Sequence, residues 1–117
     1  MTIDLHKDEF GRLTCELFDD KTHAIITASN SAEAHHGLLD AIRSVRSTGN
    51  GECYWNEASG QYRWVLRKLD AGQLRIAILW STGTVTGWEH AFWSEAPLDA
   101  FTEAIEAGLL ATSPEWK

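Results

Sequence analysis

The sequence predicts an α+β fold in which an antiparallel sheet of about five to seven strands carries two amphipathic helices on one face. Apolar residues alternate with polar residues over 2–28 and again over 51–93, which is the period of half-buried strands. They recur at helical spacing after Asn30 and again after Pro97. The expected order is therefore βββ-α-ββββ-α, within one domain covering residues 1–117.

Three short strands are expected before the first helix. Ile3 and Leu5 alternate with polar neighbours, and residues 13–17 do the same. The segment "FDDKT" has the composition of a turn, and the β-branched run "HAIITAS" after it favours a third strand.

The first helix is expected between Asn30 and Gly49. Asn30 or Ser31 can cap its start, and Glu33 follows Asn30 by three residues, as in a capping box. Gly49 suits the end of the helix. One apolar stripe runs along its length: Ala34, Leu38, Ala41, Ile42 and Val45.

A hairpin register is predicted for the strands that flank the loop Asp70-Ala71-Gly72. A three-residue loop with glycine last places Leu69 opposite Gln73. One face of the hairpin then has only apolar or aromatic pairs, and the other face is mixed. The expected pairs are Tyr62–Trp80, Trp64–Ile78 and Leu66–Ile76 on the first face, and Arg63–Leu79, Val65–Ala77 and Arg67–Arg75 on the second.

The last strand, in "GWEHAFWSEAP", follows a turn at residues 81–84. Strict alternation sends Trp88, His90 and Phe92 to the core, and Glu89 and Trp93 outward with Ala91. A closing helix is expected with Pro97 in its first turn and with an inner stripe of Leu98, Phe101, Ile105 and Leu109, and it ends at Pro114. Both halves of the chain run strand, turn, strand, cap and helix, so two β-hairpin-plus-helix halves are possible, although convergent layer packing gives the same pattern.

The composition narrows the classes of function. The net charge is −7, with acidic excess in residues 1–40 and 94–117. Such a surface repels nucleic acid and anionic lipid, so neither is expected as a partner. The N-terminal segment does not resemble a secretion signal, and no apolar run reaches the length of a membrane span, so a cytoplasmic protein is expected.

Catalytic and cofactor motifs are missing from the sequence. There is no G-x-G-x-x-G, P-loop or G-x-S-x-G segment. His35 and His36 are helix neighbours that point about 100° apart, and no H-x-x-x-H pair exists, so no metal site or cofactor is predicted. A site assembled from distant residues stays open. Cys15 and Cys53 are expected to be small buried residues without a catalytic role.

The favoured function is a non-enzymatic, acidic protein-binding module, most concretely a bacterial immunity or antitoxin-like inhibitor of a basic, nuclease-type toxin. Acidic side chains would steer a basic partner and tryptophans would supply hot spots. An acidic ridge is expected on the closing helix, where Glu95, Asp99, Glu103 and Glu106 are spaced by four, four and three residues. The partner-binding candidates are Glu89, Trp93, Glu95, Asp99, Glu103 and Glu106.

Two alternatives stay open. A small enzyme or ligand-binding protein would use an aromatic pocket between sheet and helices, lined by Trp64, Trp80, Trp88 and His90. A homodimer could form through the mixed sheet face at Arg63, Val65 and Leu79 and could coexist with either function. The basic residues Arg63, Arg67, Lys68 and Arg75 are interpreted as a solvated face rather than a nucleic-acid site.

Overall fold

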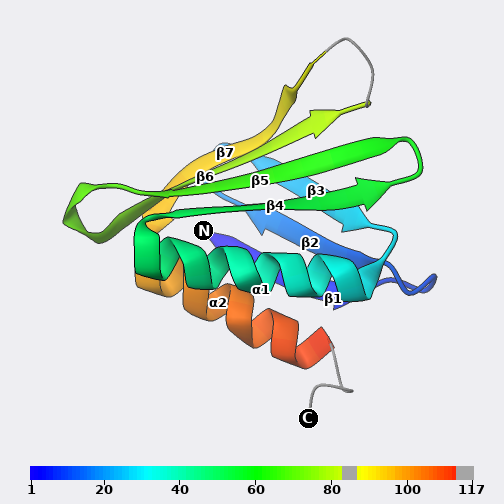
Figure 1. Cartoon of the computed structure of the whole chain (residues 1–117), viewed down its shortest axis with the longest axis horizontal. Coiled ribbons are helices and arrows are strands. Elements are labelled where there is room, and N and C mark those ends of the chain that lie inside the picture. Colours follow the sequence, from blue (N-terminus) through cyan, green and yellow to red (C-terminus); the bar gives the residue numbers. More distant parts are fainter. Residues whose placement is uncertain (83–86, 113–117) are drawn as a thin grey trace.

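The computed structural model describes residues 1–82 and 87–112. The elements follow one another in the predicted order βββ-α-ββββ-α, which is confirmed, and the fold is α+β (Figure 1). A short 3₁₀ turn lies between the fifth and sixth strands. The elements are β1 (Thr2–Lys7), β2 (Leu13–Phe18), β3 (His23–Ala28), α1 (Ser31–Thr48), β4 (Asn50–Glu57), β5 (Gly60–Lys68), the turn Asp70–Gly72, β6 (Gln73–Ser81), β7 (Glu89–Pro97) and α2 (Leu98–Thr112).

The prediction of a single sheet is wrong, because the strands form two antiparallel sheets. One has the order β1-β2-β3 and the other the order β4-β5-β6-β7. Helix α1 carries the chain from β3 to β4, so these two strands are not joined by a tight turn. They meet at their ends, where the Ser29 amide donates to the Asn56 carbonyl at 2.9 Å. The Glu57 carboxylate reinforces this junction by accepting a hydrogen bond from Thr27.

Both sheets and both helices share one hydrophobic core. Helix α1 packs along β4, and α2 packs along β1 (Figure 1). Trp55 and Trp64, both fully buried, pack on each other with ring centroids 5.1 Å apart. The helices are tied together where the buried His35 Nε2 donates to the Leu109 carbonyl at 2.9 Å.

The Asn30 cap, the helix end at Gly49 and the hairpin register are confirmed. The Asn30 side chain accepts a hydrogen bond from the Glu33 amide at the start of α1, and Gly49 ends the helix with φ 87°, the left-handed conformation that glycine favours. All six predicted pairs between β5 and β6 occur. The predicted turn at 81–84 lies partly outside the described residues, and the predicted helix stop at Pro114 lies wholly outside them.

Strand β7 corrects the predicted alternation. Ile78 pairs with Phe92 but Leu79 pairs with His90, so Ala91 is an extra residue that forms a β-bulge. The bulge reverses the phase of the strand before Phe92. Phe92 is buried as predicted, whereas His90 and Trp88 are exposed, so the expected inward imidazole is wrong.

Candidate protein-binding surface

The outer face of the four-stranded sheet exposes large aromatic side chains. Helix α1 packs on the opposite, inner face, where it meets β4 at Gly51. Tyr54, Trp88 and Trp93 are 41%, 39% and 46% exposed. The half-buried residues Val65 and Leu79 lie between them in the strand register. We call this set the aromatic sheet face: Tyr54, Arg63, Val65, Arg75, Leu79, Trp88 and Trp93.

Trp88 is held on this face by β4 and β5. The Arg63 guanidinium lies 5.9 Å from the Trp88 ring centroid, and the Tyr54 ring lies 6.4 Å from it. Arg63 also binds the Glu52 carboxylate at 2.7 Å, and the Tyr54 hydroxyl donates to Glu52 at 2.8 Å. The hydrogen bond from Arg63, followed by that from Tyr54, lowers the pKa of Glu52. The carboxylate therefore stays ionised and holds both Arg63 and Tyr54 in place.

Trp93 has a similar arrangement at the other end of the face. The Arg75 guanidinium lies 5.8 Å from the Trp93 ring centroid, and its Nη2 lies 3.8 Å from the Glu95 carboxylate. Trp93 stands opposite Ala77 in the register, and this small neighbour leaves its ring uncovered. Both exposed tryptophans are therefore held in place by arginines before any partner binds, which reduces the ordering cost of association.

The predicted partner-binding residues divide into three groups. Glu89, Trp93 and Glu95 lie exposed on β7, and Asp99 and Glu103 lie exposed on α2. Glu106 forms an ion pair with Arg46 of α1 and so joins the two helices. The predicted ridge is not continuous, because Glu95 belongs to a strand and helical spacing does not apply to it.

The alternative pocket is not formed. Trp64 is fully buried in the core and Trp80 packs on Tyr62 with ring centroids 4.6 Å apart, whereas Trp88 and His90 are exposed through the bulge. The arrangement therefore does not bring these four side chains around one cavity.

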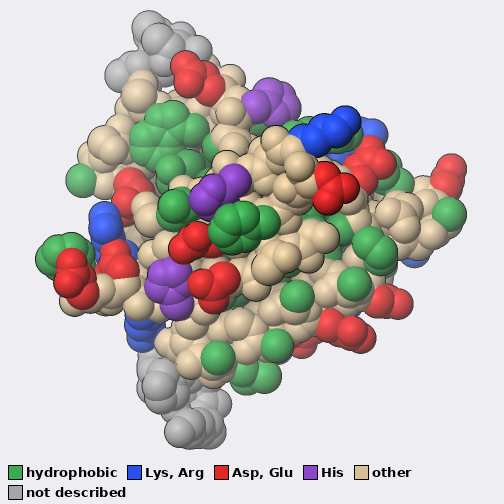
Figure 2. All heavy atoms as spheres, turned by 180° about the vertical axis from the view of Figure 1, so that it is seen from behind, with side chains coloured by type: hydrophobic (Ala, Val, Ile, Leu, Met, Phe, Trp, Pro, Cys, Tyr) green, Lys and Arg blue, Asp and Glu red, His purple; other side chains and the backbone are tan. Residues whose placement is uncertain are grey.

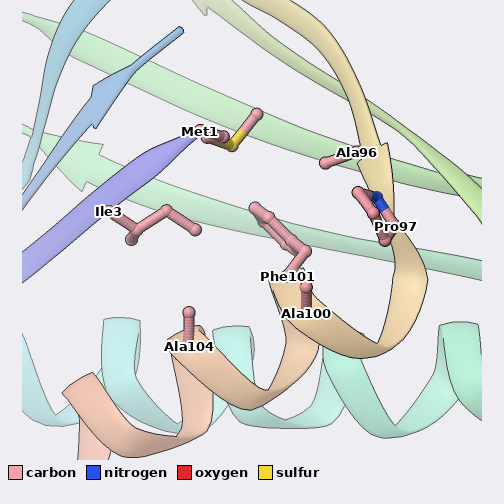
Figure 3. Close-up of a pocket in the computed structure, with 7 residues that line it drawn as sticks. All are labelled: Met1, Ile3, Ala96, Pro97, Ala100, Phe101 and Ala104. Atoms are coloured by element: carbon pink, nitrogen blue, oxygen red, sulfur yellow. The ribbon is translucent and has the colours of Figure 1, made fainter.

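Three hollows in the described part of the chain are too small for a typical ligand. The first, of about 90 Å³, lies between β1, β7 and α2 and is lined by apolar residues that include Ile3 and Phe101 (Figure 3). Two others measure about 160 Å³, between the helices, and about 170 Å³, beside Asp19. Pockets for small molecules usually enclose roughly 300–1,000 Å³.

Both cysteines are buried and unpaired, as expected. Burial raises the pKa of the Cys15 and Cys53 thiols, so neither is available as a thiolate at neutral pH.

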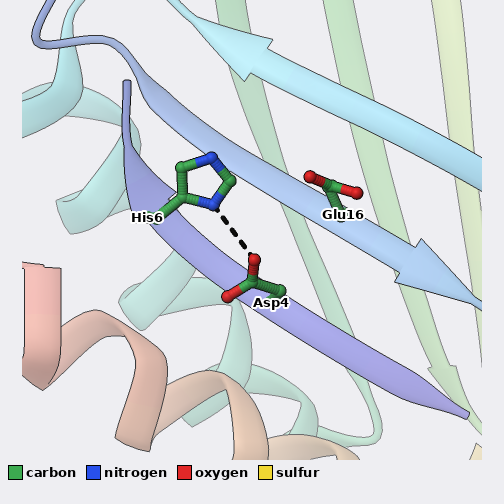
Figure 4. Close-up of side chains that lie close together, drawn as sticks. All are labelled: Asp4, His6 and Glu16. Atoms are coloured by element: carbon green, nitrogen blue, oxygen red, sulfur yellow. Dashed lines mark ion pairs between the residues drawn. The ribbon is translucent and has the colours of Figure 1, made fainter. Parts of the chain in front are cut away.

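One cluster of potential metal ligands was not predicted from the sequence. On the outer face of the three-stranded sheet, acidic, histidine and hydrophobic side chains gather (Figure 2). Asp4, His6 and Glu16 offer potential ligand atoms that all lie within 4.8 Å of one another (Figure 4). The i,i+2 spacing of Asp4 and His6 places both on one face of a strand, but only the pairing of β1 with β2 brings Glu16 beside them.

Comparisons with known proteins identify no function for this chain. None of the described helices has both the length and the apolar character needed to cross a membrane. The chain matches no protein-family model, no curated protein and no solved structure.

Proposed function

We propose that this chain is a non-enzymatic protein-binding module that docks a basic partner protein on the aromatic sheet face. Its most concrete form is a cytoplasmic, bacterial immunity or antitoxin-like inhibitor of a nuclease-type toxin. Two buried free thiols are consistent with a reducing compartment.

The single observation that carries the proposal is the pair of exposed tryptophans, each held by an arginine, on one sheet face. Trp88 and Trp93 remain 39% and 46% exposed although the chain has a well-packed core. Clustered large aromatic residues on a surface indicate an interaction site, and tryptophan, tyrosine and arginine are the residues most often found as interface hot spots. The aromatic sheet face contains all three types.

Charge favours a basic partner. The net charge is −7, and the acids Glu89, Asp99 and Glu103 are exposed on β7 and α2. On this face Arg63 and Arg75 are paired with Glu52 and Glu95, so these two arginines are largely neutralised. The acidic net charge would accelerate association with a basic protein, while the aromatic sheet face would supply affinity.

The test measures binding to basic nuclease toxins encoded beside this gene. Trp88→Ala and Trp93→Ala should each weaken binding by about 30-fold or more, which corresponds to a hot spot of about 2 kcal/mol. Phe10→Ala is the matched control, because Phe10 is an exposed ring in the β1–β2 loop with the Arg12 guanidinium 5.7 Å from its centroid. This control should bind as the wild type does.

Three results would contradict the proposal. The first is the lack of a stable complex with any basic protein encoded beside this gene. The second is equal loss of affinity in Phe10→Ala and Trp93→Ala. The third is tight binding of a single-stranded oligonucleotide that depends on Trp88, since arginines and stacked rings also suit nucleic acid.

A second copy of the chain is the competing protein partner. Arg63, Val65 and Leu79 do share the outer face, as the dimer hypothesis requires. Light scattering on the wild type and on Trp93→Ala separates the two cases, because a homodimer through this face should dissociate in the variant.

A further inference from the structure

The outer face of the three-stranded sheet gathers carboxylates and imidazoles. Asp4 and His6 project from β1, and Glu16 projects from β2 on the same side (Figure 4). The pairing register places Asp4 directly opposite Glu16. Like charges directly opposite each other on neighbouring strands destabilise a sheet, so this arrangement is unfavourable unless a positive charge lies near both groups.

The His6 ring faces the Asp4 carboxylate within this cluster. Its Nδ1 atom lies 3.2 Å from the Asp4 carboxylate, is shielded from solvent and makes no hydrogen bond of normal geometry. In the tautomer that leaves Nδ1 without a proton, its lone pair faces the carboxylate oxygen, and the two repel each other at this distance. A cation placed between them would accept electron density from both.

The donor set matches a divalent transition metal. One imidazole nitrogen and two carboxylate oxygens are ligands that Zn²⁺ accepts, with bonds of about 2.0–2.2 Å. Tetrahedral ligands at that bond length lie about 3.4 Å apart, and the three donor atoms here lie within 4.8 Å of one another. Side-chain rotation can close this difference, because Asp4 and His6 are 62% and 41% exposed.

His23 lies beside the third donor. Its Nε2 is 3.6 Å from the Glu16 carboxylate, and its ring stacks on Phe18 with centroids 4.2 Å apart and planes 12° apart. The stacked ring is fixed in position and can orient Glu16. An imidazole within ion-pair distance of a ligand carboxylate can tune that ligand from outside the coordination shell.

We propose that Asp4, His6 and Glu16 bind a divalent transition-metal ion, Zn²⁺ in the first place, with His23 as a positioning residue and water in the remaining coordination positions. The site lies on the three-stranded sheet and is separate from the aromatic sheet face. Bound metal would join β1 to β2 and neutralise the opposed carboxylates, so its expected role is to stabilise this sheet.

The test combines calorimetric titration of the full chain with Zn²⁺ and NMR spectra of its imidazole nitrogens. One ion should bind per chain, with the resonances of His6 shifted most. His6→Ala and Glu16→Gln should each lower the affinity by about tenfold or more, and His23→Ala should lower it less. His36→Ala is the matched control, because His36 pairs with Asp40 at 3.4 Å on the exposed side of α1, and no third donor joins them among residues 1–82 and 87–112.

Thermal unfolding gives a readout that does not depend on the titration. Zn²⁺ should raise the Tm of the wild type and of His36→Ala, but not that of His6→Ala. The proposal is overturned if Zn²⁺ produces no heat and no shift at His6, if His36→Ala loses as much affinity as His6→Ala, or if Ca²⁺ and Mg²⁺ bind as tightly as Zn²⁺.

Discussion

Replacing Gly51 by alanine places a methyl group where α1 leaves no room for it. Gly51 lies on the inner face of β4, and a Cβ atom there would be 2.2 Å from the Ala41 carbonyl oxygen and 3.3 Å from the Val45 Cβ. Ordinary contacts begin near 3.4 Å. The obstacle is helix backbone, which cannot rotate away, so α1 and β4 must separate by about 1 Å.

The cost follows from this separation. A gap of up to about 1 Å removes a quarter to a half of the dispersion energy between the groups it divides. Overpacking typically costs about 1–3 kcal/mol, and the rigid obstacle places Gly51→Ala at about 3 kcal/mol. For a chain of this size that change lowers the Tm by about 12 °C.

Urea unfolding followed by circular dichroism measures the effect. The midpoint should fall with an unchanged m-value, because the same surface is exposed on unfolding. Gly37→Ala is the control. Gly37 lies in α1, and a Cβ atom there would meet the Cys53 Cβ of β4 at an ordinary 3.5 Å. This change should stabilise the protein by about 0.5–1 kcal/mol through helix propensity. A Gly51→Ala protein as stable as the wild type, or a Gly37→Ala protein that is equally destabilised, would refute the packing argument.

Two further predictions concern titratable groups. Burial raises the pKa of the Cys15 and Cys53 thiols. Both thiols should therefore resist a thiol reagent in the folded protein at neutral pH and react fully in urea. Rapid labelling of the folded protein would contradict this prediction. Hydrogen bonds from the Ser94 hydroxyl and the Lys21 amide lower the pKa of Asp19 in the folded protein. The ionised Asp19 therefore contributes stability above its ordinary pKa, and this stability is lost as the pH falls through the lowered pKa of the folded state. Ser94→Ala should raise the pKa of Asp19 in a carboxyl NMR titration, and an unchanged pKa would show that Ser94 is not the cause.

The elements were predictable because their signals are local. The cap at Asn30, the stop at Gly49 and the pairing of Leu66 with Ile76 each depend on residues close in sequence. The division into two sheets was not predictable in this way. It depends on how the ends of β3 and β4 meet after an intervening helix, as at Ser29 and Asn56, and no local pattern encodes that contact.

The surface residues were predicted less completely than the core. Trp93 is exposed as expected, but the bulge at Ala91 moved Trp88 to the same side, because alternation fails where a strand gains one residue. The grouping of Glu16 with Asp4 required the register between β1 and β2, which the longer β1–β2 loop does not fix.

The bulge at Ala91, the extra residue in β7, decides which side of the sheet the preceding residues face. Regular pairing of Ala91 with Leu79 would move both Trp88 and His90 to the inner side of the sheet, while Phe92 would stay buried and Trp93 would stay exposed. A chain without this bulge, paired in that way, would therefore lose Trp88 from the aromatic sheet face and keep Trp93 there.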